Sequence, residues 1–290
     1  MPFINLLATN FAFLFMSLPW NEPFTQQLSC APLARLEAQF ILSDFSCWPN
    51  AQGLNTLKQR FHIAEHATPD FIDQDALPES DDYYEQIIFK HGHIPTRANG
   101  WHDLFNGLVW LQYPATKKYL NQLHVEDIEM HGLSPRSRLR NHITHFDECG
   151  VVLAIEHSQG SEIAELLGEH RWSEALFTRR SAWGLVIHAR MFGHANYEML
   201  LNPFIGLTGK WLAVSVKSGF AKRSVLEQNA EIDAGLHEMI RDKALFEQTK
   251  PLLPIPLLGI PAWSEQNQVE QFYQNRDYFR PKRISTNSNK

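Results

Sequence analysis

Apolar residues recur at helical intervals along much of the chain. The clearest stretch is Trp101–Gln112, where leucine, phenylalanine and valine fall on one side of a helix until Pro114 interrupts the pattern. Similar spacing predicts further helices over Leu33–Phe40, Leu54–His66, Ala115–His124, Ser161–Gly168 and Val225–Phe246. The spacing across Trp172–Leu201 is also mainly helical.

Fewer stretches have the composition of strands. His142–Phe146 and Val151–Ile155 flank a short polar segment that ends in Gly150, where a turn would need positive φ. We therefore expect a β-hairpin near residues 142–156. Other candidate strands are Glu85–Phe89, Val186–Ile187 and Lys210–Lys217. Together these patterns predict an α+β fold, a single mainly helical domain with a small antiparallel sheet.

The amino terminus is apolar and carries no charged side chain from Met1 to Trp20. It lacks the early positive residues of a signal peptide, because the first basic residue is Arg35. The apolar run Phe11–Leu18 is also too short to cross a bilayer core of about 30 Å. The pattern favours a helix packed on the protein, with peripheral membrane contact as the alternative.

Composition limits the possible partners. The 290 residues are 44% hydrophobic and 20% charged, as expected for one globular domain. The net charge of -6 argues against sequence-independent nucleic-acid binding, which needs a dense positive surface, but a small-molecule substrate remains possible. Three cysteines without CxxC spacing predict a reducing, cytoplasmic location.

Fourteen histidines form an unusually large share of the sequence, and several lie close to carboxylates or amides. His102 and Asn106 share one face of the predicted helix, next to Asp103, so His102 is a candidate metal ligand or base. The alternative is that this segment simply begins and caps the helix. His194 and Glu198 are four residues apart, the spacing by which a helix presents two metal ligands, although an exposed His/Glu contact explains the pair equally well.

Three further groups complete the set of candidates. His124 is near the end of a predicted helix, where a histidine commonly interacts with the terminal carbonyls. Asp147 and Glu148 are candidate carboxylates for catalysis, or ordinary turn residues. Arg138 and Arg140 are candidates for binding an anionic substrate, or part of a solvated loop. The established motifs HExxH, GxGxxG, GxSxG and GxxxxGK[ST] are absent from the sequence.

Several ordered motifs resemble the bacterial family of unknown function DUF3025. They are Gly100–Leu111 with Tyr113-Pro114, Lys117, Asn121 and His124, then Arg138–Gly150, Phe192–Glu198, Thr208–Lys210, Leu257–Trp263 and Phe272–Pro281. The resemblance implies a bacterial, cytoplasmic protein but supplies no reaction. It places a DUF3025-like domain at residues 33–283, between a hydrophobic N-terminal extension at 1–32 and a disordered tail at 284–290.

The leading functional hypothesis is a metal-dependent hydrolase. Its metal site would gather His102, His124, His194 and Glu198 around zinc, manganese or iron. Asp103, Asp147 or Glu148 would take a proton from the metal-bound water, and Asn106, Arg138 and Arg140 would bind the substrate. The rival is a non-catalytic binding or scaffold protein in which His102, Asn106 and Glu198 satisfy one another by buried hydrogen bonds.

Overall fold

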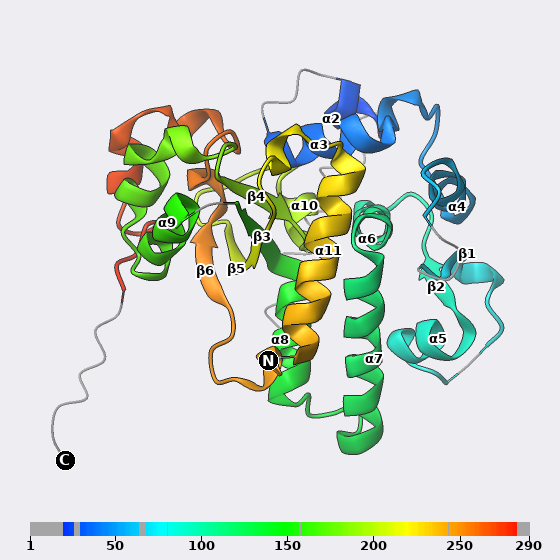
Figure 1. Cartoon of the computed structure of the whole chain (residues 1–290). Coiled ribbons are helices and arrows are strands. Elements are labelled where there is room, and N and C mark those ends of the chain that lie inside the picture. The colour runs from blue at the N-terminus through cyan, green and yellow to red at the C-terminus, as the bar shows by residue number, and fades with distance from the viewer. Residues whose placement is uncertain are drawn as a thin grey trace, which may run out of the picture.

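The structure is a computed structural model that describes residues 20–25, 30–63, 68–79, 81–156, 158–242 and 244–282. The α-helices within these ranges are α2 (Glu22–Thr25), α3 (Ala31–Phe40), α4 (Ala51–Arg60), α5 (Tyr84–His91), α6 (Trp101–Gln112), α7 (Pro114–His131), α8 (Arg138–Cys149), α9 (Ser158–Gly168), α10 (His194–Met199) and α11 (Val225–Asp242). The strands are β1 (Asp70–Asp73), β2 (His93–Thr96), β3 (Gly150–Ile155), β4 (Ile187–Met191), β5 (Thr208–Ser215) and β6 (Leu253–Pro256), as Figure 1 shows.

The larger sheet has the strand order β4-β3-β5-β6. Strand β3 is antiparallel to β4 and parallel to β5, and β5 is antiparallel to β6. Every residue of β3 is buried, as expected for a central strand that is covered on both faces. Helices α8 and α11 pack against β5, and α9 packs against β3 and β4. The sheet therefore forms the centre of the hydrophobic core.

A second, two-stranded sheet lies beside α4 and α5, on the far side of α7 from the larger sheet (Figure 1). Its strands β1 and β2 are parallel, and α5 is in the segment that connects them. Asn55 on α4 ties this sheet to the helix, since its side chain both donates to and accepts from the backbone of Phe71. This small layer forms one wall of a cavity described below.

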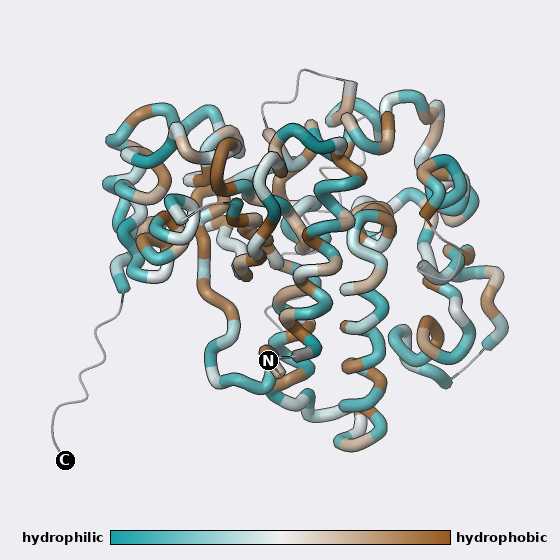
Figure 2. The backbone as a smooth tube through the Cα atoms, viewed as in Figure 1, coloured by the Kyte–Doolittle hydropathy of each residue, from teal (hydrophilic) through white to brown (hydrophobic). Residues whose placement is uncertain are grey.

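Most of the predicted helices are present, and the α+β class is confirmed. Helix α6 has the predicted bounds, and α3, α4, α7, α9 and α11 overlap their predicted ranges. Helix accounts for 56% of the structure and strand for 13%. Figure 2 shows why the helices could be recognised from the sequence. The long helices alternate polar and apolar residues along their length, whereas the central strands are largely apolar.

The β-hairpin predicted near 142–156 is wrong, because its first half is the second half of helix α8. Arg140, Ile143 and Phe146 are the buried positions of that helix, at intervals of three residues. Gly150 has a φ of -66° and starts β3, so it is not a turn glycine. A Cβ on Gly150 would lie 2.4 Å from the carbonyl oxygen of Phe146, so the close approach of backbone requires glycine there.

Two other strand expectations change. Glu85–Phe89 is part of helix α5, whose Gln86 side chain accepts a hydrogen bond from the backbone of Tyr83 and whose end is set by Gly92 at a φ of 66°. The sheet is mixed, not purely antiparallel, because β3 and β5 are parallel neighbours. Of the expected strand Val186–Ile187, Ile187 is the first residue of β4 and Val186 precedes it.

The described part of the amino terminus packs into the protein. Trp20 and Phe24 are buried in the same hydrophobic core as Leu33 and Leu36 of α3. Residues 1–19 of the predicted extension, and the tail at 284–290, lie outside the described residues.

Candidate functional site

Three of the predicted site residues come together where α10 packs against α6. The Nδ1 atom of His102 on α6 lies 3.5 Å from Oε2 of Glu198 on α10. The rings of His102 and His194 meet edge to face, with centroids 4.6 Å apart. The side chains of His102 and Glu198 are 42% and 39% exposed, so this pair opens to solvent, whereas His194 is buried.

The half-buried carboxylate of Asp147 lies behind His194. The Nδ1 atom of His194 lies 3.7 Å from Oδ2 of Asp147 at the end of α8, and no described residue hydrogen bonds to that Nδ1. Burial lowers the pKa of His194 to about 4, and the nearby Asp147 charge only partly opposes this effect. His194 is therefore neutral near pH 7. The pKa of His102 is raised, chiefly by the hydrogen bond with Glu198.

Asp147 has a second partner, the buried ammonium of Lys117 on α7. Lys117 Nζ lies 2.5 Å from Oδ1 of Asp147 and donates to Oδ1 of Asn106 at 2.9 Å. The Nδ2 group of Asn106 in turn donates to the hydroxyl of Tyr84 at 2.9 Å. Burial opposes ionisation of Asp147, but Lys117 and His194 outweigh it and hold its pKa below the usual range. The result is a continuous polar network from Tyr84 to His194.

Tight backbone packing places His194 against Asp147. Gly193 precedes α10, and a Cβ there would lie 2.4 Å from the carbonyl oxygen of Glu148 and 2.5 Å from the nitrogen of Gly150. The Nδ2 group of Asn196 donates to the carbonyl of Cys149 at 3.2 Å. The start of α10 is therefore fixed on the junction between α8 and β3.

Asp103 and Glu148 do not join the histidine pair. The Asp103 carboxylate accepts three hydrogen bonds from Arg97, one from the backbone nitrogen and two from the guanidinium, at 2.6, 3.0 and 2.8 Å. Its pKa is lowered because the Arg97 contacts outweigh the effect of burial. Glu148 is half-buried, and its charge contributes to the raised pKa of His102 without a direct contact.

His124 lies apart from the other two predicted histidines. It is buried on α7 two turns beyond Lys117, and its Nδ1 has no hydrogen-bond partner among the described residues. Burial lowers the pKa of His124 despite the nearby charges of Glu85 and Asp147. With Lys117 and Asp147 it lines a hollow of about 10 Å³, about enough space for one water molecule.

The two predicted arginines are at the other end of α8. Arg138 is exposed at the first position of the helix, about 13 Å along the axis from Asp147 for a rise of about 1.5 Å per residue. Arg140 is 2% exposed and donates to the carbonyls of Gly132 and Leu133 at 2.9 and 2.7 Å. Its Nε lies 3.5 Å from Asp127, so Arg140 holds the loop between α7 and α8.

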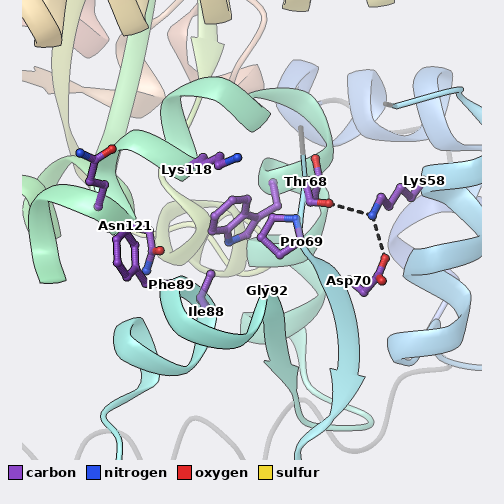
Figure 3. A pocket seen from close by; sticks show the side chains of 11 residues that line it. Lys58, Thr68, Pro69, Asp70, Ile88, Phe89, Gly92, Lys118 and Asn121 are labelled. Atoms are coloured by element: carbon purple, nitrogen blue, oxygen red, sulfur yellow. Dashed lines mark hydrogen bonds and ion pairs between the residues drawn. The ribbon is translucent and has the colours of Figure 1, made fainter. Parts of the chain in front are cut away.

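A cavity of about 330 Å³, the size of a small-ligand pocket, opens beyond this hollow. The two spaces share Ile88, Trp110 and Asn121 as lining residues. Figure 3 shows Lys58 at one side, where its ammonium reaches the carbonyl of Thr68 and the carboxylate of Asp70 at 2.7 and 2.8 Å. The cavity therefore adjoins the hollow that Lys117, His124 and Asp147 line.

Lys117 and Tyr84 belong to this polar network but were not among the site residues predicted from the sequence. Lys117, Asn121 and His124 share one face of α7 at intervals of four and three residues, a pattern visible in the sequence. Tyr84 carries no such signal, because it reaches Asn106 from a helix whose sequence resembles a strand. Its pKa is raised well above the ordinary value, mainly by burial.

Metal ligands are not preassembled in the described ranges, where no group of three or more His, Cys, Asp or Glu side chains is arranged to hold an ion. Among the same residues, no helix is both long and apolar enough to span a bilayer.

Comparison with known proteins gives a family and no relative of known activity. Neither a curated protein nor a solved structure matches the chain. A family described as "Protein of unknown function (DUF3025)" matches residues 69–283, most of the chain. The match includes α6, α7, α8 and α10, the four helices that carry the histidines and their charged partners. The chain therefore belongs to the DUF3025 family.

Proposed function

We propose that the chain is a metal-dependent hydrolase with His102, His194 and Glu198 as its metal ligands. Two histidines and one glutamate form a known ligand set for catalytic zinc, in which water takes the fourth position. The supporting observation is the meeting of these three side chains between α6 and α10, at a point open to solvent. His102 and Glu198 are exposed enough to change rotamer around an ion.

The protonation states suit this ligand set. A metal ligand must be a neutral imidazole, and burial already keeps His194 neutral at pH 7. A carboxylate beside the second ring nitrogen fixes the orientation of a metal-binding histidine, and Asp147 occupies that place for His194. Since Lys117 already neutralises one oxygen of Asp147, we assign Asp147 this orienting role and not direct ligation.

An ion held by His102, His194 and Glu198 would supply the activation of a water molecule for hydrolysis. A divalent ion lowers the pKa of its water towards about 7, which supplies hydroxide under neutral conditions. Zinc fits the nitrogen and oxygen donors, and manganese or iron are alternatives. His124, Asp103, Arg138 and Arg140 have no part in this site, because each lies away from the histidine pair or is held by other partners.

Metal content tests the proposal. Full-length chain without an affinity tag should carry close to one zinc, manganese or iron ion, and His194→Ala should lose it. His188→Ala is the matched control, since His188 is 3% exposed, has a pKa lowered to about 4 by burial and lies 3.8 Å from Glu156. Metal-free wild-type chain, or equal metal content in both variants, would contradict the proposal.

A second candidate function is a non-catalytic binding protein, and Lys117 favours it. The Lys117 ammonium satisfies Asp147 and Asn106 directly, so this part of the cluster needs no ion. Asn106 bonds to Lys117 and Tyr84, not to His102 or Glu198 as the scaffold hypothesis expects. In this case the chain would contain no metal and would keep its unfolding temperature in the presence of a chelator.

A further inference from the structure

A second cavity, of about 150 Å³, lies between α3, β4 and α10. Arg35 from α3 and Arg190 from β4 both line it, together with Tyr113, Tyr197 and Trp263. A space of this volume holds several water molecules, so it accommodates a small ligand. None of these residues belongs to the proposed metal site.

The two arginines lack a carboxylate partner among the described residues. Oε1 of Gln228, a neutral amide, accepts from both guanidiniums, at 3.0 Å from Arg35 and 2.8 Å from Arg190. The other bonds go to Oδ1 of Asn229 from Arg35 and to the carbonyl of Ala189 from Arg190. The Nε atoms of both arginines are buried and have no hydrogen-bond partner in the described chain. Two positive charges therefore share neutral acceptors only.

This arrangement is unfavourable unless an anion compensates it. Burial, together with the smaller effect of the Arg35 charge, lowers the pKa of Arg190 to about 10. Burial likewise lowers the pKa of Arg35. Arg35 and Arg190 are half-buried, and their Nε atoms are fully buried, so both charges are partly removed from water. A desolvated charge normally has a counterion, and two like charges side by side increase the need for one. The whole chain is acidic, with a net charge of -6, so the two neighbouring arginines do not simply reflect a basic composition.

The lining also indicates the kind of ligand. A guanidinium presents paired N–H groups that match the oxygens of a carboxylate or phosphate. Tyr113 and Tyr197 are 1% and 2% exposed, and a buried tyrosine hydroxyl is a suitable hydrogen-bond donor to an anion. Trp263 and Met191 supply an apolar wall. We propose that this cavity binds a small anion with a carboxylate or phosphate group, held by Arg35 and Arg190.

Calorimetric titration of the full chain tests this site. The probes are inorganic phosphate and succinate, each added at constant ionic strength maintained with chloride. At least one should bind saturably, with one ion per chain, and whichever binds identifies the anion class. Arg190→Met should weaken that binding at least tenfold, the usual effect of losing a charge-assisted hydrogen bond.

Arg140→Met is the control, because Arg140 is more deeply buried than Arg190 but is paired with Asp127 and two carbonyls. It should lower the unfolding temperature and keep the anion affinity. Arg190→Met removes an uncompensated charge, so it should not lower the unfolding temperature of the anion-free chain. If Arg190→Met does not fold, Arg190→Lys replaces it in the test. This variant keeps the charge without the paired N–H groups, so it should bind the anion more weakly than the wild type.

His188 supplies a second measurement. The charges of Arg190 and Arg35 add to burial in lowering its pKa to about 4, so a bound anion should raise the pKa of His188 in an NMR titration. No saturable binding of either probe, or an equal loss of affinity in Arg190→Met and Arg140→Met, would overturn the proposal. The outcome is independent of metal content, since His194→Ala should bind the anion normally.

Discussion

Lys117 Nζ on α7 lies 2.5 Å from Asp147 Oδ1 on α8, with Lys117 only 5% exposed. The pair joins two consecutive helices across their loop, and the ammonium also lies 5.3 Å from the ring centre of Trp110. The other oxygen of Asp147 faces His194. The Lys117–Asp147 ion pair therefore determines the charge next to His194, which we assign as a metal ligand.

Removing one member of this pair should be strongly destabilising. Lys117→Met leaves the half-buried Asp147 carboxylate and the buried Asn106 amide without their cation, so the free energy of unfolding should fall by about 3 kcal/mol. Urea unfolding measures the change. The double variant Lys117→Met/Asp147→Asn should lose less than the sum of the single losses.

Lys90→Met is the control, because Lys90 forms an ion pair with Asp82 at 2.6 Å but is 44% exposed. It should change stability by less than about 1 kcal/mol. Equal losses in Lys117→Met and Lys90→Met would show that the buried pair has no special role.

His194 should make the fold sensitive to mild acid. Its native pKa of about 4 lies below the ordinary value of 6.5, so the unfolded chain binds more protons between these values. Stability from this group is therefore present above about pH 6.5 and is lost as the pH falls towards 4. The loss between about pH 7 and pH 5 is on the order of 2 kcal/mol.

Urea unfolding of wild type and His194→Gln at both pH values measures this contribution. The pH-dependent loss should be smaller in the variant, because other groups titrate identically in the two chains. An equal loss of stability between the two pH values in both chains would mean that His194 titrates normally in the folded protein.

Gly193 should tolerate no side chain. Gly193→Ala brings a Cβ within 2.6 Å of three backbone atoms at the end of α8, so we expect a loss of at least about 2 kcal/mol and displacement of His194. Gly100→Ala is the matched control at the start of α6, since a Cβ there meets nothing within 4 Å and the backbone needs no positive φ. Thermal unfolding compares the two, and an unfolding temperature for Gly193→Ala as high as that of Gly100→Ala would contradict the packing argument.

Metal affinity should depend on the protonation of His102. The Glu198 contact raises the pKa of His102, which favours the imidazolium and therefore competes with an ion. Zinc affinity, measured with a competing chelator, should fall as the pH drops through this pKa. Glu198→Gln removes both a ligand and the cause of the shift, so binding should be weaker at high pH. An affinity that does not change with pH would exclude His102 as a ligand.

Long periodic helices were predictable from the sequence because one burial period extends over several turns. Trp101–Gln112 is the best case. Helix α8 was not, since a β-branched stretch followed by a glycine is also typical of a hairpin. Two signals that favour the helix are physical: Ser137 accepts a hydrogen bond from Arg140 at the helix start, and Gly150 is required by close packing and not by its φ.

The candidate site was predictable only in part, because local spacing shows which side chains share a helix face but not how the helices pack together. The spacing of His194 and Glu198 fixes their common face on α10, and His102 begins a strongly periodic helix. Which other polar residues reach them depends on how α7 and α8 pack. Lys117 and Tyr84 meet Asn106 through contacts 11 and 22 residues apart, which no local pattern encodes.

Anomalous X-ray diffraction from a zinc-loaded crystal of the chain tests the central proposal most directly. The account predicts a zinc peak about 2.0–2.1 Å from an imidazole nitrogen of both His102 and His194, with a Glu198 oxygen as the third protein ligand. A crystal with no zinc there, or with zinc bound to other residues, would contradict it.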